Sequence, residues 1–334
     1  MSRKGLEMKI VFFNRSLMSG GIEKCIELLS EYLYEDNKIE IAFSHTDKLD
    51  MHIVDRFKKY AEVTMLENKV IECDLCIFCN IYFDEKIMDQ IKANKYFLWI
   101  HSKPREMPNC VLDNKKIVDR IDKFICVSQE VKNELHIDDG RVSVIHNFIN
   151  QNIQELANER NPFENIRDDT LKLVVVSRLS TGKGFERVEL LVQALEQLEI
   201  SYKLKIVGKG RAKEQEIRVN LGKYKGVEFE GYQDNPYCYI KNADYLIQLS
   251  DYESWGNVIT EAKALQVPCV VTDFPSAKEQ IQDGTNGIIV KRKMENYENI
   301  VIRMVKEKQI LKQNLKNFEY TNEIQKWRNI IQIK

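Results

Sequence analysis

Short apolar runs alternate with stretches of helical periodicity along the chain, and this alternation constrains its fold more than any other feature. After the run 8–13, residues Ile22, Ile26, Leu29 and Leu33 recur at the spacing of one helix face. The runs expected to form strands are 8–13, 38–44, 61–66, 73–79, 95–101, 123–128 and 141–148, then 171–177, 202–208, 226–232, 244–250, 268–272 and 287–290. Apolar strands separated by crossovers indicate parallel sheets covered on both faces.

A polar stretch interrupts this alternation near the middle of the chain. Residues 150–170 are mostly polar and charged, include Pro162 and show no strand pattern, which is typical of a linker. We therefore expect an α/β protein with two doubly wound, Rossmann-like domains, residues 1–155 and 169–318, facing a cleft. A last helix, about 319–334, is expected to pack back on the first domain. Ligands of such sheets bind beyond the carboxyl ends of the strands.

Composition and charge narrow the class of protein. The 334 residues are 43% hydrophobic and 30% charged, which indicates a folded chain rather than a disordered one. The formal net charge of −1 gives no global field for nucleic acid or an anionic membrane, so an anion site has to be local. No apolar run approaches the roughly 18 residues that cross a bilayer, and the amino terminus lacks signal-peptide features. These features predict a cytoplasmic protein.

Three of the eight cysteines lie close together, at Cys73, Cys76 and Cys79. Their spacing could suit a metal, but the residues between them are apolar and no second Cys or His pair follows nearby. Small side chains in a buried strand explain the pattern, and we expect no metal site there.

The segment "ESWGNVITEA" places seven residues between Glu253 and Glu261 and follows an apolar run. Gly256 allows a close backbone approach, and a helix is expected from about Asn257, whose free N–H groups suit a diphosphate. Glu261 falls about one turn inside that helix, roughly 6 Å from its start, where it could accept hydrogen bonds from a ribose diol. Glu253 could reach hydroxyl groups of an attached sugar. Two ordinary glutamates favoured by the helix dipole remain the alternative.

The segment "SRLSTGKGFERV" follows the first apolar run of the second half. Arg178 and Lys183 fall in its loop beside two glycines, and two cations there could neutralise a departing diphosphate without a metal. A solvated basic loop is the alternative. The spacing of a Walker A phosphate loop is absent.

Three weaker signals also follow apolar runs. Gly208 lies in "IVGKGR", and Gly20 and Gly21 lie in "MSGGIEK", where backbone amides could approach a phosphate or simply form a turn. His101 ends the run "FLWIH" and would face the cleft, although a lone histidine is more often structural. Together, the signals place small or charged residues at strand ends in both halves.

These segments resemble glycosyltransferase family 4, the retaining GT-B enzymes, over about residues 8 to 332. The segment 253–262 resembles the family's two-glutamate signature, and 177–184 resembles its Arg and Lys donor loop. The resemblance implies a GT-B architecture of the bacterial surface-polysaccharide type. It assigns donor binding to Glu261, Asn257, Val258, Gly256, Gly20, Gly21 and Gly208, and catalysis to Glu253, Arg178, Lys183 and His101. Glu261 would hold the ribose, Arg178 and Lys183 the diphosphate, and His101 the transferred sugar.

The implied activity is transfer of a hexose-type sugar from a nucleotide-diphosphate sugar, most naturally a UDP-sugar, to a glycan or polyprenyl-linked glycan. The resemblance implies no metal requirement and no tightly bound cofactor. A non-catalytic partner subunit and a transferase that makes a soluble glycoside are the alternatives. A lipid-linked acceptor would favour peripheral contact with the inner membrane. Its candidate surface is "NKKIVDRIDKF", residues 114–124, which also fits an ordinary amphipathic crossover.

Overall fold

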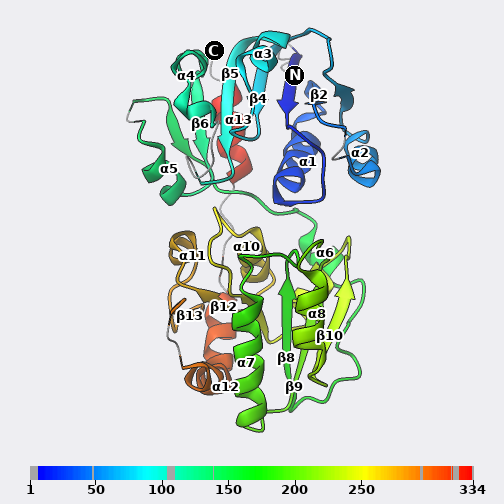
Figure 1. Cartoon of the computed structure of the whole chain (residues 1–334), viewed down its shortest axis with the longest axis vertical. Helices are drawn as coiled ribbons and strands as arrows, with labels where there is room; N and C mark the ends of the chain where they lie inside the picture. The colour runs from blue at the N-terminus through cyan, green and yellow to red at the C-terminus, as the bar shows by residue number, and fades with distance from the viewer. Residues whose placement is uncertain are drawn as a thin grey trace, which may run out of the picture. The chain divides into compact units, whose positions relative to one another are not determined.

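The computed structural model describes residues 7–46, 49–103, 110–137, 139–293, 296–316, 318 and 323–332. The chain divides into two compact units, Met1–Phe148 with Asn322–Lys334, and Ile149–Thr321 (Figure 1). Residues 149–155, which the sequence assigned to the first domain, therefore lie in the second unit. Their apolar side chains explain the difference, because Ile153 and Ala157 of helix α6 (Ile153–Ala157) are buried against helix α9 (Tyr237–Lys241).

The first unit is built on one parallel sheet of seven strands in the order β3-β2-β1-β4-β5-β6-β7. Its strands are β1 (Met8–Phe13), β2 (Asn37–Phe43), β3 (Glu62–Met65), β4 (Ile71–Phe78), β5 (Ile91–Ile100), β6 (Lys123–Cys126) and β7 (Val142–Val144). Its helices are α1 (Gly21–Leu33), α2 (Met51–Phe57), α3 (Glu85–Gln90), the 3-10 turn η1 (Val111–Asp113), α4 (Lys115–Arg120), α5 (Gln129–Leu135) and α13 (Glu323–Gln332).

The second unit repeats the plan with six parallel strands in the order β10-β9-β8-β11-β12-β13. Its strands are β8 (Leu171–Val176), β9 (Tyr202–Val207), β10 (Val227–Gly231), β11 (Tyr245–Gln248), β12 (Cys269–Thr272) and β13 (Gly287–Val290). Besides α6 and α9, its helices are α7 (Phe185–Gln197), α8 (Glu214–Gly222), α10 (Asn257–Ala264), α11 (Pro275–Gln280) and α12 (Tyr297–Leu315). The predicted α/β fold with two doubly wound parallel sheets is confirmed.

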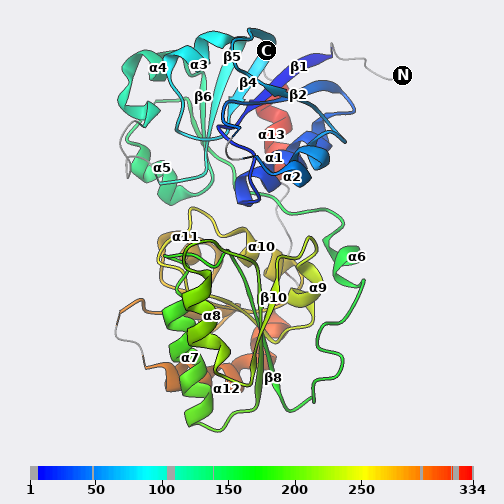
Figure 2. The same cartoon turned by 45° about the vertical axis from the view of Figure 1, so that its right-hand side comes forward.

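Successive residues of β8 are buried on opposite faces of this second sheet. Leu173 and Val175 are buried with α7, α8 and α12, whereas Val174 between them is buried with α6, α9, α10 and α11. Figure 2 shows α7 and α8 on one side of the sheet and α9 on the other. Burial on both faces explains why these strands appear in the sequence as continuous apolar runs rather than as alternating ones.

Both sheets have a topological switch point, where the strand order reverses. In the first unit it lies between β1 and β4, and in the second between β8 and β11. Parallel sheets bind ligands beyond the carboxyl ends of the strands at such points. The loops that follow β8 and β11 are the ones that contain Lys183 and Glu253.

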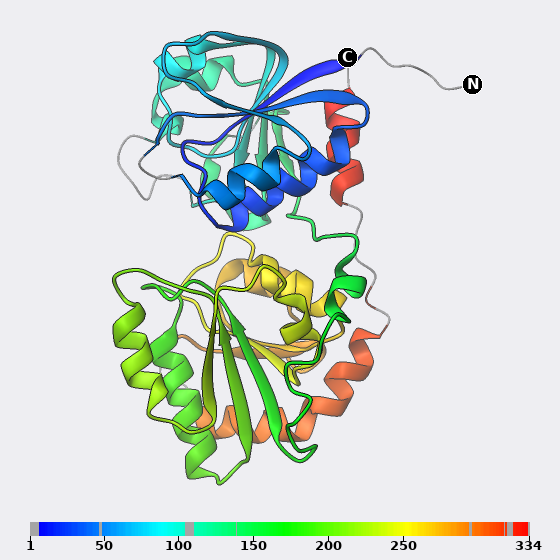
Figure 3. The same cartoon turned by 90° about the vertical axis from the view of Figure 1, so that its right-hand side faces the viewer.

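The terminal helix α13, drawn in red in Figure 3, packs within the first unit. The ring of Trp327 lies edge-on to Trp99 of β5, with ring centroids 4.6 Å apart. The carboxylate of Glu323 is buried and accepts a hydrogen bond of 3.0 Å from the backbone N–H of His146. A helix is therefore present within the predicted range 319–334, and it starts at Glu323 in the part of the chain that is described.

The cysteines of β4 behave as strand residues. Cys76 and Cys79 are buried, and burial raises the pKa of the Cys73 thiol to about 12, so the thiol stays protonated at neutral pH. Among the described residues, no group of three or more His, Cys, Asp or Glu side chains could hold a metal ion. Within the same residues, no helix has both the length and the apolar character needed to span a membrane.

Candidate active site

The loops after β8 and β11 meet through an ion pair. Lys183 Nζ lies 2.7 Å from Glu253 Oε1, and both side chains are largely buried, at 20% and 16% exposure. The same oxygen accepts hydrogen bonds from Gln248 Nε2 at 2.7 Å and from Ser250 Oγ at 2.8 Å. Three donors thus converge on Oε1, while Oε2 accepts no hydrogen bond from the described residues. The structure therefore brings two predicted site residues together at the switch point of the second sheet.

Helix α10 begins directly beside this pair. Gly256 is its N-cap residue and has the left-handed conformation, with φ of 79°, where a side chain would introduce strain. In the part of the chain that is described, no side chain makes a capping hydrogen bond at Gly256, and the first turn carries no acidic residue. The backbone N–H groups of Asn257 and Val258 lie in the first turn of this helix. Such a helix start is suited to an anion.

Glu261 lies one turn further along α10 and is 9% exposed. The helix around it is fixed by buried polar contacts: Trp255 Nε1 donates to Thr260 Oγ1 at 3.0 Å, and Thr260 Oγ1 donates to Gln280 Oε1 at 2.8 Å. Because these contacts hold the helix in place, the buried carboxylate of Glu261 has a defined position from which to contact a polar ligand.

The loop after β8 is held against the end of β11. Gly184, the N-cap of α7, has φ of 71°, and a Cβ atom there would lie 1.7 Å from the carbonyl oxygen of Leu249. Only glycine fits this approach. The N–H of Asp251 also donates to the carbonyl of Gly182 at 2.9 Å. Arg178, in contrast, is exposed, and its guanidinium makes no ion pair with the carboxylates in the described ranges.

Gly208 lies at the end of β9, in the same unit. Its N–H donates to the carbonyl of Gly231 at 2.7 Å, and the N–H of Gly210 donates to Glu214 Oε2 at 2.7 Å. Both amides are thus engaged within the protein, so this turn does not present them to a phosphate as the Gly-Lys-Gly sequence suggests.

In the first unit, Gly20 and Gly21 start helix α1, again without a side-chain cap. Glu23, in the first turn of that helix, accepts a hydrogen bond of 3.0 Å from Asn14 Nδ2. The Nδ2 group of Asn80 donates to Asn14 Oδ1 at 2.8 Å. The side chain of Glu23 therefore organises the loop in which a phosphate was expected.

Asn14 and Asn80 were missed in the sequence, although each directly follows a run expected to form a strand. Both are buried, and they join the ends of β1 and β4 at the switch point of the first sheet. A single polar residue after an apolar strand is the signal that could have found them. Gln248 and Ser250 were missed for a different reason, because their contacts with Glu253 depend on the turn after β11.

His101 lies at the carboxyl end of β5, as predicted. Its ring packs on Trp99, with centroids 4.3 Å apart, and its Nε2 atom is buried without a hydrogen-bond partner among the described residues. Burial lowers the pKa of His101 from 6.5 to about 3, so the ring is neutral at physiological pH. A neutral imidazole can donate or accept a hydrogen bond but contributes no charge.

The candidate membrane-facing surface, residues 114–124, has an apolar side that is buried and basic residues near carboxylates. Ile117 and Ile121 are buried, so the apolar side of this segment belongs to the core. Arg120 pairs with Asp89 at 2.7 Å, and Lys116 lies 3.8 Å from Glu85. These contacts favour the alternative of an ordinary amphipathic crossover, in which Lys116 and Arg120 lie near carboxylates.

Two parallel-sheet Rossmann-like units with these switch points define the GT-B class of folds. Residues 157–321 match the model of the family described as Glycosyl transferases group 1. This match lies within the second unit, and the resemblance to a glycosyltransferase family inferred from the sequence is confirmed by it.

Named relatives share this part of the chain. An N-acetylgalactosaminyltransferase of Campylobacter jejuni that acts on a diphospho-undecaprenol-linked sugar is 27% identical over 50% of this chain and 45% of its own length. The N-acetyl-α-D-glucosaminyl L-malate synthase of Bacillus anthracis is 28% identical over 52% and 47%. The chain thus spans about half the length of the curated relatives it matches.

Solved structures extend the likeness to the whole fold. The complex of Anabaena Alr3699/HepE with UDP and glucose superposes with a TM-score of 0.74 at 17% identity, covering 97% of this chain and 99% of that one. S. aureus TarM, in a complex that contains UDP, has a TM-score of 0.70 at 12% identity, covering 97% and 100%. At these identities the likeness concerns the fold alone.

Proposed function

We propose that this protein is a retaining glycosyltransferase. It transfers a hexose-type sugar from a nucleotide-diphosphate sugar, preferably a UDP-sugar, to a glycan or lipid-linked glycan in surface-polysaccharide synthesis. The contact that carries the proposal is the Lys183–Glu253 pair beside the start of α10, with Glu261 one turn further on. A cation, a helix start and two carboxylates are the groups that diphosphate, ribose and sugar hydroxyls require.

In this proposal the candidate site residues of the second unit have separate roles. Glu261 accepts hydrogen bonds from the ribose diol, and the amides of Asn257 and Val258 meet the diphosphate. Lys183, together with the exposed Arg178, neutralises the charge that develops as the nucleotide departs. Glu253 holds hydroxyl groups of the donor sugar, or its phosphate, through the oxygen that the protein leaves open.

The chemistry follows from these roles. The acceptor hydroxyl attacks the anomeric carbon on the face from which the nucleotide leaves, so the new C–O bond forms as the bond to phosphate breaks. The departing phosphate oxygen takes the hydroxyl proton. The names of the two curated relatives describe α-glycosyl transfer, which retention gives from a sugar that is α-linked to its phosphate.

His101 would contact the transferred sugar as a neutral hydrogen-bonding group. Its buried Nε2 has no hydrogen-bond partner among the described residues, which supports this role, since a buried polar atom without a partner is costly unless a ligand or water completes it. Gly20 and Gly21 stay candidates for a backbone contact with the donor. Gly208 is kept only as a residue that shapes the nucleotide side of the site.

The acceptor and the place of action are inferred more broadly. The Campylobacter relative works on a polyprenyl-linked sugar, which favours a similar acceptor here. We propose action in the cytoplasm, with membrane contact made through the acceptor rather than through α4. Sedimentation with anionic vesicles, with and without a polyprenyl-linked glycan, tests this: binding to plain vesicles contradicts it.

The deciding experiment is a screen of UDP-, GDP- and ADP-sugars by thermal shift and by donor hydrolysis. A ligand present at 100 times its Kd stabilises the fold by about 2.7 kcal/mol, a shift that is easily measured. We expect UDP-sugars to stabilise and to be hydrolysed slowly. Binding without hydrolysis or transfer to any acceptor would favour a non-catalytic partner subunit, and no binding at all would end the proposal.

A further inference from the structure

The segment 249–255, which contains Glu253, is fixed by side chains from several other elements. It follows β11 and no longer belongs to the sheet, yet five of its backbone carbonyls each accept a side-chain hydrogen bond. The donors are Arg187 to Leu249, Thr272 to Ser250, Arg292 to Asp251, Ser276 to Glu253 and Gln280 to Trp255. The conformation of this segment is therefore set by its surroundings, and Glu253 is presented in one orientation.

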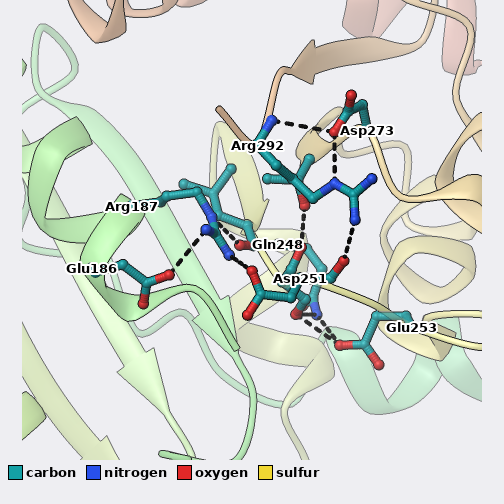
Figure 4. A network of polar contacts seen from close by, with 10 residues as sticks. Glu186, Arg187, Gln248, Asp251, Glu253, Asp273 and Arg292 are labelled. Carbon is teal, nitrogen blue, oxygen red and sulfur yellow. Dashed lines mark hydrogen bonds and ion pairs between the residues drawn. The ribbon is translucent and has the colours of Figure 1, made fainter. Parts of the chain in front are cut away.

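Arg187 contacts this segment twice, once at a backbone carbonyl and once at a side chain. From the first turn of α7, its Nε donates to the carbonyl of Leu249 at 2.8 Å and its Nη2 donates to Asp251 Oδ1 at 2.5 Å. Its Nη1 lies 3.0 Å from Glu186 Oε1. The side chain is only 11% exposed. Figure 4 shows Arg187 reaching Asp251 from α7 while Arg292 reaches it from the end of β13.

This geometry excludes the simplest alternative role for Arg187. A third cation for a diphosphate would need N–H groups that a ligand can reach, whereas this side chain is only 11% exposed. Each of the three guanidinium nitrogens already faces an acceptor of the protein, and two carboxylates offset its charge. The guanidinium is therefore committed to the segment 249–255 rather than to a ligand.

We propose that Arg187 is a positioning residue, which sets the segment 249–255 so that Glu253 meets Lys183 and turns its open oxygen toward the donor sugar. This inference rests on the proposed function. Arg187 and Lys183 lie four positions apart at the start of α7, and Asp251 and Glu253 lie two apart after β11. Two ion pairs thus join the same two segments, and the Arg187–Asp251 pair aligns the Lys183–Glu253 pair.

The test compares Arg187→Lys and Arg187→Ala with Glu186→Gln. Lysine keeps the charge but cannot reproduce a planar fork with three acceptors. Glu186 is 65% exposed and contacts Arg187 without touching the segment, so Glu186→Gln is the matched control. We expect both Arg187 variants to lower kcat on the order of 10- to 100-fold, the cost of a small misplacement. The Kd for UDP, which lacks the sugar that Glu253 meets, should stay near the wild-type value, and Glu186→Gln should turn over normally.

A double-mutant cycle with Glu253→Ala separates positioning from general destabilisation. If Arg187 acts through Glu253, Arg187→Ala adds little further loss of turnover once Glu253 is gone. Independent, multiplying losses overturn the assignment, as does an Arg187→Ala variant that lowers Tm but keeps wild-type kcat. If Arg187→Ala does not fold, Asp251→Asn, which removes one charged acceptor and keeps its shape, replaces it in the same cycle.

The outcome also distinguishes this inference from the function on which it rests. A wild-type protein that neither binds nor hydrolyses any nucleotide sugar overturns the proposed function and the role of Arg187 with it. An active wild type whose Arg187 variants behave like Glu186→Gln overturns the positioning role alone.

Discussion

Lys183 Nζ and Glu253 Oε1 lie 2.7 Å apart, although one residue follows β8 and the other follows β11. The pair joins the two strands at the switch point, where a parallel sheet receives its ligand. In the proposed function, a nucleotide-sugar donor would meet both members of this pair, Lys183 through the diphosphate and Glu253 through the sugar. The predictions below address the groups around this pair.

The first prediction concerns Arg178 and Lys183 together. Stabilisation of a departing diphosphate grows as the glycosidic bond breaks, so its loss appears in turnover more than in affinity. Replacing both residues by alanine should lower kcat on the order of 10²-fold or more, with a smaller change in donor affinity. Steady-state kinetics with the matched donor measures both, and circular dichroism checks folding.

Lys225→Ala is the control for this double variant, because Lys225 is exposed in the turn before β10, at the opposite end of the sheet. It should turn over like the wild type. A folded Arg178/Lys183 double variant with wild-type kcat would leave these two cations as ordinary surface charge.

The second prediction concerns Glu261. Glutamine keeps its shape but removes the charge that a ribose diol would meet, and hydrogen bonds to charged groups contribute about 1.5–3 kcal/mol. Glu261→Gln should therefore weaken UDP binding by roughly 10- to 150-fold, measured by calorimetry. Glu298, an exposed first-turn acid of α12, provides the comparison: Glu298→Gln should leave the Kd unchanged. Equal Kd values for both variants would show that Glu261 does not bind the ribose and is an ordinary glutamate favoured by the helix dipole.

The sequence predicted the fold because its strands are buried on both faces. The run 8–13 is β1 with the same bounds, and the loops after β8 and β11 could be placed at one sheet edge before any contact was known. The boundary between units was less predictable. Ile153, Ala157 and Phe163 are three apolar residues in a polar stretch, and only their burial against α9 and its neighbours assigns them to the second unit.

Contacts that depend on the direction of a side chain could not be predicted from the sequence. Arg187 is one of several charged residues in "GKGFERVE", and nothing in its spacing distinguishes it from Glu186. Its role emerges only when α7 docks against the end of β11. The engaged amide of Gly208 is the converse case, since the pattern suggests a free N–H that the fold directs to Gly231.

The third prediction is that turnover persists in EDTA. Lys183, Arg178 and the amides at the start of α10 provide the positive potential that a divalent ion would otherwise supply to a diphosphate. The measurement is the transfer rate after dialysis against chelator, with and without added magnesium or manganese. A complete loss that either metal restores would show that these groups do not suffice.

The last prediction concerns His101 and the stability of the first unit at acid pH. Burial lowers its pKa from 6.5 to about 3, so between these values the unfolded chain binds a proton at this site that the folded chain does not. Stability linked to His101 is therefore present above pH 6.5 and is lost as the pH falls through this window. His101→Phe keeps an aromatic ring on Trp99 but cannot titrate, so it should lose less stability than the wild type between pH 7.5 and about 4.5. Carboxylates such as Asp244 also lose stability on acidification, but they do so equally in both proteins. Burial raises the pKa of Asp244, but hydrogen bonds from the backbone N–H of Lys172 and from Lys312 lower it overall. The difference between the pH dependences of unfolding free energy of the two proteins, measured by urea unfolding, thus reports on His101 alone.

Parallel pH profiles would mean that the imidazole is solvated and titrates normally, and they would remove the argument for a neutral ring in contact with the sugar.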